Sequence, residues 1–154
     1  MKYEINYFGN LKVAVQPRVE LYNVSDFMGT PMHGLAIVLD EIGNTSEKSG
    51  QFAVLTISFG EFIGMKNCAY IDINNCPWAN QLLQEGFAED TGFTHESGFC
   101  IYPLWHFHED FLKEHGEDNY AKYSDGYDKY MASVFETGDE DEDDLSEGEL
   151  NMQM

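Results

Sequence analysis

The sequence predicts an α+β protein: a mostly antiparallel sheet packed by two or three helices, followed by an acidic C-terminal tail. Short strand-like segments separated by turn residues fill the first half of the 154-residue chain, and apolar residues at helical spacing follow them. Acidic residues dominate the end of the chain. A run of short strands joined by turns favours antiparallel pairing, and strands followed by helices favour the α+β class. We expect residues 1–137 to form one domain and residues 138–154 to form an acidic tail that is disordered when free.

The first expected element is a β-hairpin. Residues 3–8 and 11–16 flank Gly9 and Asn10, and glycine permits the positive φ that a tight hairpin turn needs. Pro17 then interrupts the second strand, because proline cannot donate a hydrogen bond to a strand ladder. We therefore expect any continuation of this strand to lie on an edge of the sheet.

Three further strands extend the predicted sheet. Residues 35–39 are an apolar run of strand length, residues 51–59 are rich in Val, Thr, Ile and Phe, and residues 69–73 form a shorter segment. Gly, Pro, Asn and Ser punctuate the intervals between them, as is typical of turns. The pattern predicts one meander of short antiparallel strands.

A helix is expected to begin at residues 74–77, which read Asn-Asn-Cys-Pro. Proline is tolerated in the first turn of a helix, Trp78 and Leu82 share one helical face, and Gly86 suits the end of the helix. The two asparagines either cap this helix or are polar residues of a functional site.

Strands at residues 91–93 and 99–104 are expected next, followed by a short helix with Phe107 and Phe111 on one side. A longer helix then carries apolar residues at sustained helical spacing. These residues are Tyr120, Tyr123, Tyr127, Tyr130, Met131, Val134 and Phe135. The tyrosines either pack this helix on the sheet or, at Tyr123 and Tyr127, form a surface for a partner, because tyrosine is common in both settings.

The chain is strongly acidic, with 28 Asp and Glu against 8 Lys and Arg, a formal net charge of −20 and a pI near 4.2. Residues 134–154 hold nine acids and no Lys or Arg, and residues 1–133 hold 19 acids and 8 bases. The folded part is therefore acidic in its own right. This charge argues against direct binding to nucleic acid or to an anionic membrane, because contacts to phosphates require Lys and Arg.

Six consecutive carboxylates run from Asp139 to Asp144. An extended chain places one residue every ~3.3 Å, and each strand of duplex DNA carries one charge per ~3.4 Å. The run is compatible with mimicry of DNA, and equally with a tail that only keeps the protein in solution.

Metal and thiol chemistry have weak support. His106 and His108 would share one face of a strand, and Cys100 and His115 are near them in the sequence, but the paired ligand spacing of zinc sites is absent. The three cysteines, Cys68, Cys76 and Cys100, lack the basic surroundings that activate a thiol. We expect no metal and no cofactor, and phosphate-binding glycine motifs are also absent. An odd number of cysteines, without a signal peptide or a long apolar run, predicts a reducing cytoplasm.

Four segments resemble an uncharacterised family of small bacterial proteins carried on conjugative elements and phages. They are residues 34–40 (GLAIVLD), 52–58 (FAVLTIS), 67–78 (NCAYIDINNCPW) and 97–104 (SGFCIYPL). The resemblance covers residues 34–105, and its most specific piece is Asn-Asn-Cys-Pro-Trp. It implies no known activity and no site residues, but it implies a mobile element, a setting in which proteins that disarm host defences are common. Residues 106–137 are then an acidic helical extension of that core.

The leading hypothesis is an acidic inhibitor, of the anti-CRISPR or anti-restriction kind, that acts as a DNA mimic. Its partner would be a basic nucleic-acid-binding protein, a host defence nuclease such as a Cas effector, because a cleft lined with Lys and Arg attracts polyanions. The residues expected to contact this partner are Glu109, Asp110, Glu114, Glu117, Asp118, Asp125, Asp128, Asp139, Glu140, Asp141, Glu142, Asp143, Asp144, Tyr123 and Tyr127.

Two other hypotheses stay open. The chain can be a regulatory or scaffolding module that binds a partner other than nucleic acid through its tyrosines or a sheet edge. It can also be a metal-assisted enzyme around His106 and His108, although we expect no catalytic residues.

Overall fold

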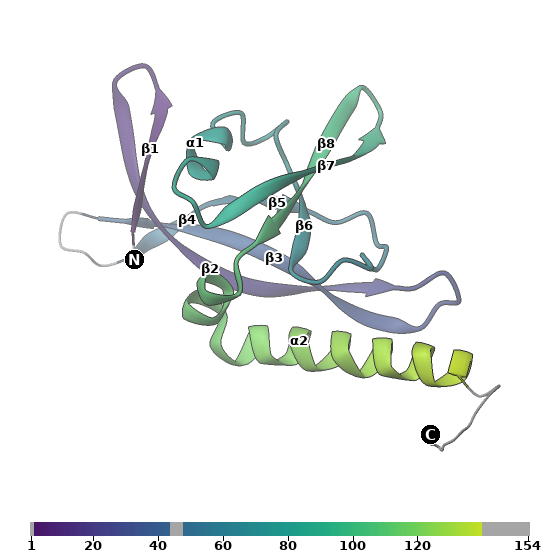
Figure 1. Cartoon of the computed structure of the whole chain (residues 1–154). Coiled ribbons are helices and arrows are strands. Elements are labelled where there is room, and N and C mark those ends of the chain that lie inside the picture. Colours follow the sequence, from purple (N-terminus) through teal and green to yellow (C-terminus); the bar gives the residue numbers. More distant parts are fainter. Residues whose placement is uncertain (1, 44–47, 140–154) are drawn as a thin grey trace. The chain divides into compact units, whose positions relative to one another are not determined.

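Strands dominate residues 2–43 and 48–139, the part of the chain that the computed structural model describes (Figure 1). The elements are β1 (Tyr3–Phe8), β2 (Leu11–Ser25), β3 (Pro31–Ile42), β4 (Lys48–Val54), β5 (Thr56–Ile57), β6 (Cys68–Ile71), α1 (Asn80–Leu83), β7 (Ala88–Ser97), β8 (Cys100–Phe107) and α2 (Glu109–Asp139). The strands form two four-stranded sheets, ordered β1-β2-β3-β4 and β5-β6-β8-β7, in which neighbouring strands are antiparallel. The predicted α+β fold with a mostly antiparallel sheet is confirmed, and the expected single meander is divided between two sheets.

The chain divides into two compact units, Met1–Tyr123 and Ser124–Met154. The first unit contains both sheets, α1 and the beginning of α2. The second contains the rest of α2, of which the structure describes residues 124–139. The predicted tail residues 140–154 lie outside the described residues.

The β1–β2 hairpin forms as expected, with Gly9 at φ 58° in its turn. Pro17 does not interrupt β2, which continues to Ser25. Pairing with β1 ends at Val15, and beyond it β2 pairs only with β3, where Pro17 is opposite Leu39. A strand with one neighbour leaves one side of its backbone open, so the missing N–H of proline need not remove a ladder hydrogen bond.

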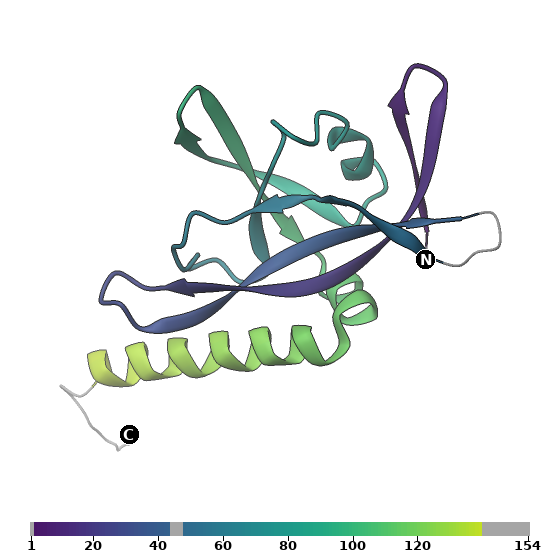
Figure 2. The same ribbon diagram turned by 180° about the vertical axis from the view of Figure 1, so that it is seen from behind.

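The core lies between the two sheets, and β3 carries the apolar run at its centre. Residues 35–40 are all buried, which is typical of a strand covered on both faces. The chain crosses from one sheet to the other at Leu55, whose N–H donates to the carbonyl oxygen of Ile37 (2.8 Å) and whose carbonyl oxygen accepts from the N–H of Asp72 (2.9 Å). The view from behind shows the strands of the two sheets running in different directions (Figure 2).

The prediction that a helix begins at residues 74–77 is wrong, both in the residue at which the helix begins and in the way it is capped. α1 begins at Asn80, and its N-cap residue, Ala79, makes no side-chain cap hydrogen bond. Asp72 instead holds the preceding turn, because its carboxylate accepts from the N–H (3.2 Å) and Nδ2 (2.8 Å) of Asn75 and its carbonyl oxygen accepts from the N–H of Cys76 (2.8 Å). The asparagine at this position therefore stabilises a turn.

The β7–β8 hairpin is longer than its sequence pattern predicted. β7 includes residues 95–97, which were expected to form a loop, and Gly98 (φ 63°) lies in the turn. Phe107, which was expected on a helix, is the last residue of β8 and is fully buried. The chain then enters α2 at Glu109.

α2 is kinked at Glu117, which has φ 46° and separates two helical segments. Gly116 lies against β2, since a Cβ at this position would be 2.7 Å from the Cβ of Tyr120 and 3.0 Å from the Cβ of Val19. Only glycine permits so close an approach. After the kink, Asn119 Nδ2 donates to the carbonyl oxygen of Val19 (2.9 Å) and Tyr120 Oη donates to Asn67 Oδ1 (2.9 Å). These contacts fix the first half of α2 on the sheets.

Candidate functional site

The predicted acidic residues of α2 are on the surface. All those with described side chains are exposed, namely Glu109, Asp110, Glu114, Glu117, Asp118, Asp125 and Asp128. Asp139 ends α2 with its side chain outside the described residues, and residues 140–144 lie outside them entirely.

Lysines reduce the negative charge of this helix. Lys113 Nζ is 3.1 Å from Glu109 Oε2, in the i,i+4 arrangement that stabilises helices. The sequence repeats this spacing where Lys122 follows Asp118 and Lys129 follows Asp125. Some acidic residues of α2 are therefore placed where an ion pair with lysine stabilises the helix.

Three exposed carboxylates on β7 were not among the predicted site residues. Glu89, Asp90 and Glu96 are exposed on this strand. The sequence has no Lys or Arg between Lys66 and Lys113, and this gap is the signal that could have identified these carboxylates. Glu89 and Asp90 are neighbours on the strand, so their side chains point to opposite faces, and the name β7 acidic surface is used for Glu89, Asp90 and Glu96 together.

Two more carboxylates act on the phenol of Tyr3. Burial, followed by the negative charges of Glu114 and Glu85, raises the pKa of Tyr3. Both carboxylates are therefore near the same phenol ring, although one belongs to α2 and the other follows α1. Acidic residues that are distant in the sequence thus act on the same residue of the first unit.

His106 and His108 flank Glu89. His106 Nδ1 is 3.8 Å from Glu89 Oε1, and His108 Nε2 is 3.8 Å from Glu89 Oε2. Across residues 2–43 and 48–139, no three His, Cys, Asp or Glu side chains come close enough together to hold a metal ion. The two imidazoles thus contact a carboxylate on the neighbouring strand.

The structure corrects the expected role of Tyr123. This residue is 4% exposed, and its Oη accepts a hydrogen bond from the N–H of Asn67 (2.9 Å). It packs near Tyr120, with ring centroids 6.1 Å apart, so it belongs to the core and is not an exposed partner surface. Helical spacing alone could not distinguish these two roles. Tyr127, in the second unit, is half-buried.

Burial makes two of the three thiols poor nucleophiles. It raises the pKa of Cys68 to about 11, and burial together with the charge of Asp72 raises the pKa of Cys76 to about 11. Cys100 is partly exposed. Thiolate is the reactive form, and at a pKa of about 11 on the order of one thiol in a thousand is ionised at pH 8.

We expect a thiol reagent at pH 8 to label one cysteine of the native protein rapidly and the other two only upon unfolding. The rapid phase should belong to Cys100 and disappear in Cys100→Ser, as followed by the absorbance of the released chromophore. Rapid labelling of two or three thiols in the native protein would contradict the burial of Cys68 and Cys76.

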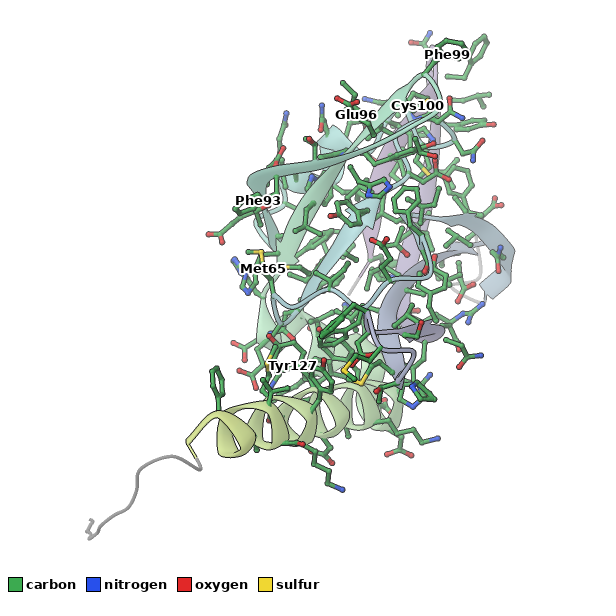
Figure 3. All side chains as sticks on the ribbon, turned by 90° about the vertical axis from the view of Figure 1, so that its right-hand side faces the viewer. Met65, Phe93, Glu96, Phe99, Cys100 and Tyr127 are labelled. Carbon is green, nitrogen blue, oxygen red and sulfur yellow. The ribbon has the colours of Figure 1, made fainter. Side chains whose placement is uncertain are left out.

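A pocket of about 310 Å³ opens in the first unit. It is lined from β2, β3, the segment of residues 57–65, β6, β7, β8 and α2, so its walls come from both sheets. Its aromatic lining residues are Tyr22, Phe59, Phe62, Tyr70, Phe93 and Tyr123. Met65 and Phe93, both labelled in Figure 3, line the pocket and are 41% and 59% exposed, so they lie at its mouth, where it opens to solvent.

Besides the tyrosine hydroxyls, this pocket has several other polar side chains. The lining includes Glu61, His33, Ser58 and Thr94, and among the described residues that line it there is no Lys or Arg. Glu61 makes no ion pair with any residue in the described part of the chain and is exposed. No motif in the sequence predicts this pocket.

Neither α1 nor α2, as far as the structure describes them, combines the length and the apolar character that a membrane crossing requires. A family model, described as a domain of unknown function (DUF4313), matches residues 22–127. The match begins within β2 and includes the first half of α2. No curated protein and no solved structure matches the chain.

Proposed function

We propose that this chain, which belongs to the DUF4313 family, is an acidic interaction protein that inhibits a host defence nuclease by occupying its basic nucleic-acid-binding surface. The observation that supports this function best is the exposure of carboxylates over a long stretch without compensating bases. The β7 acidic surface and the start of α2 present Glu89, Asp90, Glu96, Glu109 and Asp110, all exposed. Lys113, at the end of this stretch, forms an ion pair with Glu109, and the imidazoles of His106 and His108 each lie 3.8 Å from Glu89.

The physical basis is electrostatic attraction between unlike surfaces. A nucleic-acid channel lined with Lys and Arg has a positive potential that accelerates the association of a polyanion. Such exposed charges are screened over ~8 Å at physiological ionic strength, so binding must weaken as salt is added. The acidic run from Asp139 to Asp144 would add to this attraction.

The family match divides these acids into two groups. Residues 22–127 include the β7 acidic surface, so a role of this surface would concern the domain that defines the family. Asp128 and the run from Asp139 to Asp144 follow the match and would adapt this member to its own partner.

The proposal is tested by capture of proteins from a bacterial lysate with the intact chain and with neutralised variants, at low and at high salt. One variant carries Glu89→Gln and Glu96→Gln, and another replaces the carboxylates of residues 139–144 by amides. The matched control, Glu4→Gln with Glu41→Gln, removes the same number of charges as the first variant from β1 and β3.

We expect the intact chain to retain a nuclease at low salt and release it at high salt. Each exposed charge pair contributes about 0.2–1 kcal/mol, so losing the six carboxylates of residues 139–144 should weaken affinity by roughly tenfold or more. The control should bind like the unmodified protein. If the amount of captured nuclease changed neither with salt nor with neutralisation of the carboxylates, electrostatic mimicry would be contradicted. Binding through uncharged side chains would then be favoured.

A further inference from the structure

The pocket between the sheets combines aromatic faces with an unpaired carboxylate. Tyr70, Phe59 and Phe93 line it beside Glu61, which has no ion-pair partner in the described part of the chain. Burial raises the pKa of Tyr70, and the negative charge of Glu61 raises it further. The carboxylate of Glu61 is therefore near enough to influence the phenol of Tyr70. The site has two features that attract positive charge.

The residues that line the pocket favour a positively charged ligand over a negatively charged one. The face of an aromatic ring is negative and attracts ammonium and guanidinium groups, and a carboxylate adds a full negative charge. An anion would find no Lys or Arg among the described lining residues, and His33 is the one lining side chain that can become positive. The chemistry of the pocket therefore fits an organic cation.

The carboxylate is held on a fixed segment. The N–H of Ser25 donates to the carbonyl oxygen of Gly60 (3.1 Å), and the N–H of Phe62 donates to the carbonyl oxygen of Ser25 (2.9 Å). Both residues next to Glu61 are thus hydrogen-bonded to the end of β2. A backbone that is fixed before binding lowers the conformational entropy that the protein loses when a ligand binds.

The hydroxyl groups of two lining tyrosines are already engaged. Tyr22 Oη donates to the carbonyl oxygen of Thr56 (3.1 Å), and Tyr123 Oη accepts from the N–H of Asn67 (2.9 Å). Phe59 is supported by His95, whose ring stacks at a centroid distance of 3.9 Å. These contacts hold the aromatic wall in place.

We propose that this pocket binds the side chain of an arginine presented by the basic partner. The proposal rests on the proposed function, in which the partner surface is rich in Lys and Arg. A planar guanidinium can stack on an aromatic face while it donates two hydrogen bonds to a carboxylate, which a lysine ammonium cannot do. A volume of about 310 Å³ is near the lower end of ligand sites and suits one side chain. Met65 and Phe93 at the mouth would contact the residues next to that arginine.

The test uses two small probes and needs no nuclease. Nα-acetyl-arginine amide and Nα-acetyl-citrulline amide have nearly the same shape, but only the first is charged. Binding is measured from the NMR chemical shifts of the full-length protein. We expect arginine to bind in the millimolar range, about tenfold more tightly than citrulline, with the largest shifts around the pocket.

Three variants locate the site. Glu61→Gln keeps the shape and should reduce the preference for arginine severalfold, and Phe93→Ser changes an exposed residue at the mouth and should also weaken binding. Glu4→Gln is the matched control, because this exposed acid of β1 is not a lining residue and is not assigned to the partner surface, and it should leave binding unchanged. The NMR spectrum of each variant verifies that it is folded.

Equal binding of the two probes would show a merely apolar pocket and overturn the proposal. Absence of arginine binding, or an equal effect of Glu61→Gln and Glu4→Gln, would also overturn it. Arginine binding without capture of a nuclease would instead refute the proposed function and leave the pocket assignment standing. Capture of a nuclease without arginine binding would overturn the pocket assignment and leave the proposed function standing.

Discussion

Replacing Trp105 with alanine is expected to lower the free energy of unfolding by about 3–5 kcal/mol, the largest effect that we anticipate for a single substitution. Trp105 is fully buried on β8, pairs with Ala69 of β6 and Asp90 of β7, and packs against Phe107 with ring centroids 6.3 Å apart. Truncation would leave a cavity in the centre of the second sheet. Urea denaturation followed by circular dichroism measures the loss.

Two comparisons sharpen this prediction. The indole N–H of Trp105 has no hydrogen-bond partner among the described residues, so Trp105→Phe removes an unpaired donor and should cost less than half as much as the alanine variant. Ile101→Ala, at an exposed position of the same strand, should change stability by less than about 0.5 kcal/mol. A loss below about 1 kcal/mol for Trp105→Ala would contradict the described core.

Replacing Asp40 with alanine is expected to lower the free energy of unfolding by about 1.5–3 kcal/mol. The Asp40 side chain is 7% exposed, and its Oδ2 accepts a hydrogen bond from Arg18 Nε at 2.8 Å. Arg18 is the one arginine of the sequence, and its side chain is 35% exposed. The variant leaves this guanidinium partly buried without its most buried partner.

Glu20→Gln is the matched control for this ion pair. Glu20 also pairs with Arg18, but its side chain is 45% exposed, and exposed pairs contribute about 0–1 kcal/mol. Denaturation of both variants under identical conditions should therefore show a clearly larger loss in the free energy of unfolding for Asp40→Ala than for Glu20→Gln. Equal losses would show that burial does not strengthen the contact between Arg18 and Asp40.

The fold class could be predicted because local patterns determine it. Alternation in the first strands, glycine in the first turn and the helical spacing after Tyr120 all agree with the structure. The division into two sheets could not be predicted, because strands of both sheets have the same two-residue period and the crossing at Leu55 shows no turn signal. Pairing partners depend on contacts that are distant in the sequence.

The candidate site was predictable only in part, for the same reason. The exposure of the α2 acids could be predicted, because they lie on the polar side of the helical pattern. The burial of Tyr123 could not, because its hydroxyl group contacts Asn67, which is far away in the sequence. Asp72 holds the turn at Asn75, and this contact outweighed the capping signal. The pocket could not be predicted because its lining comes from elements of both sheets.

The most direct test of electrostatic mimicry is a competition between this protein and DNA for the captured nuclease. A fluorescent duplex is bound to the nuclease, and the intact chain is titrated in while fluorescence anisotropy reports the bound duplex. We predict that the duplex is displaced completely, and that the required concentration of chain rises with salt and with neutralisation of residues 139–144. A ternary complex, in which chain and duplex bind the nuclease together, would contradict the account.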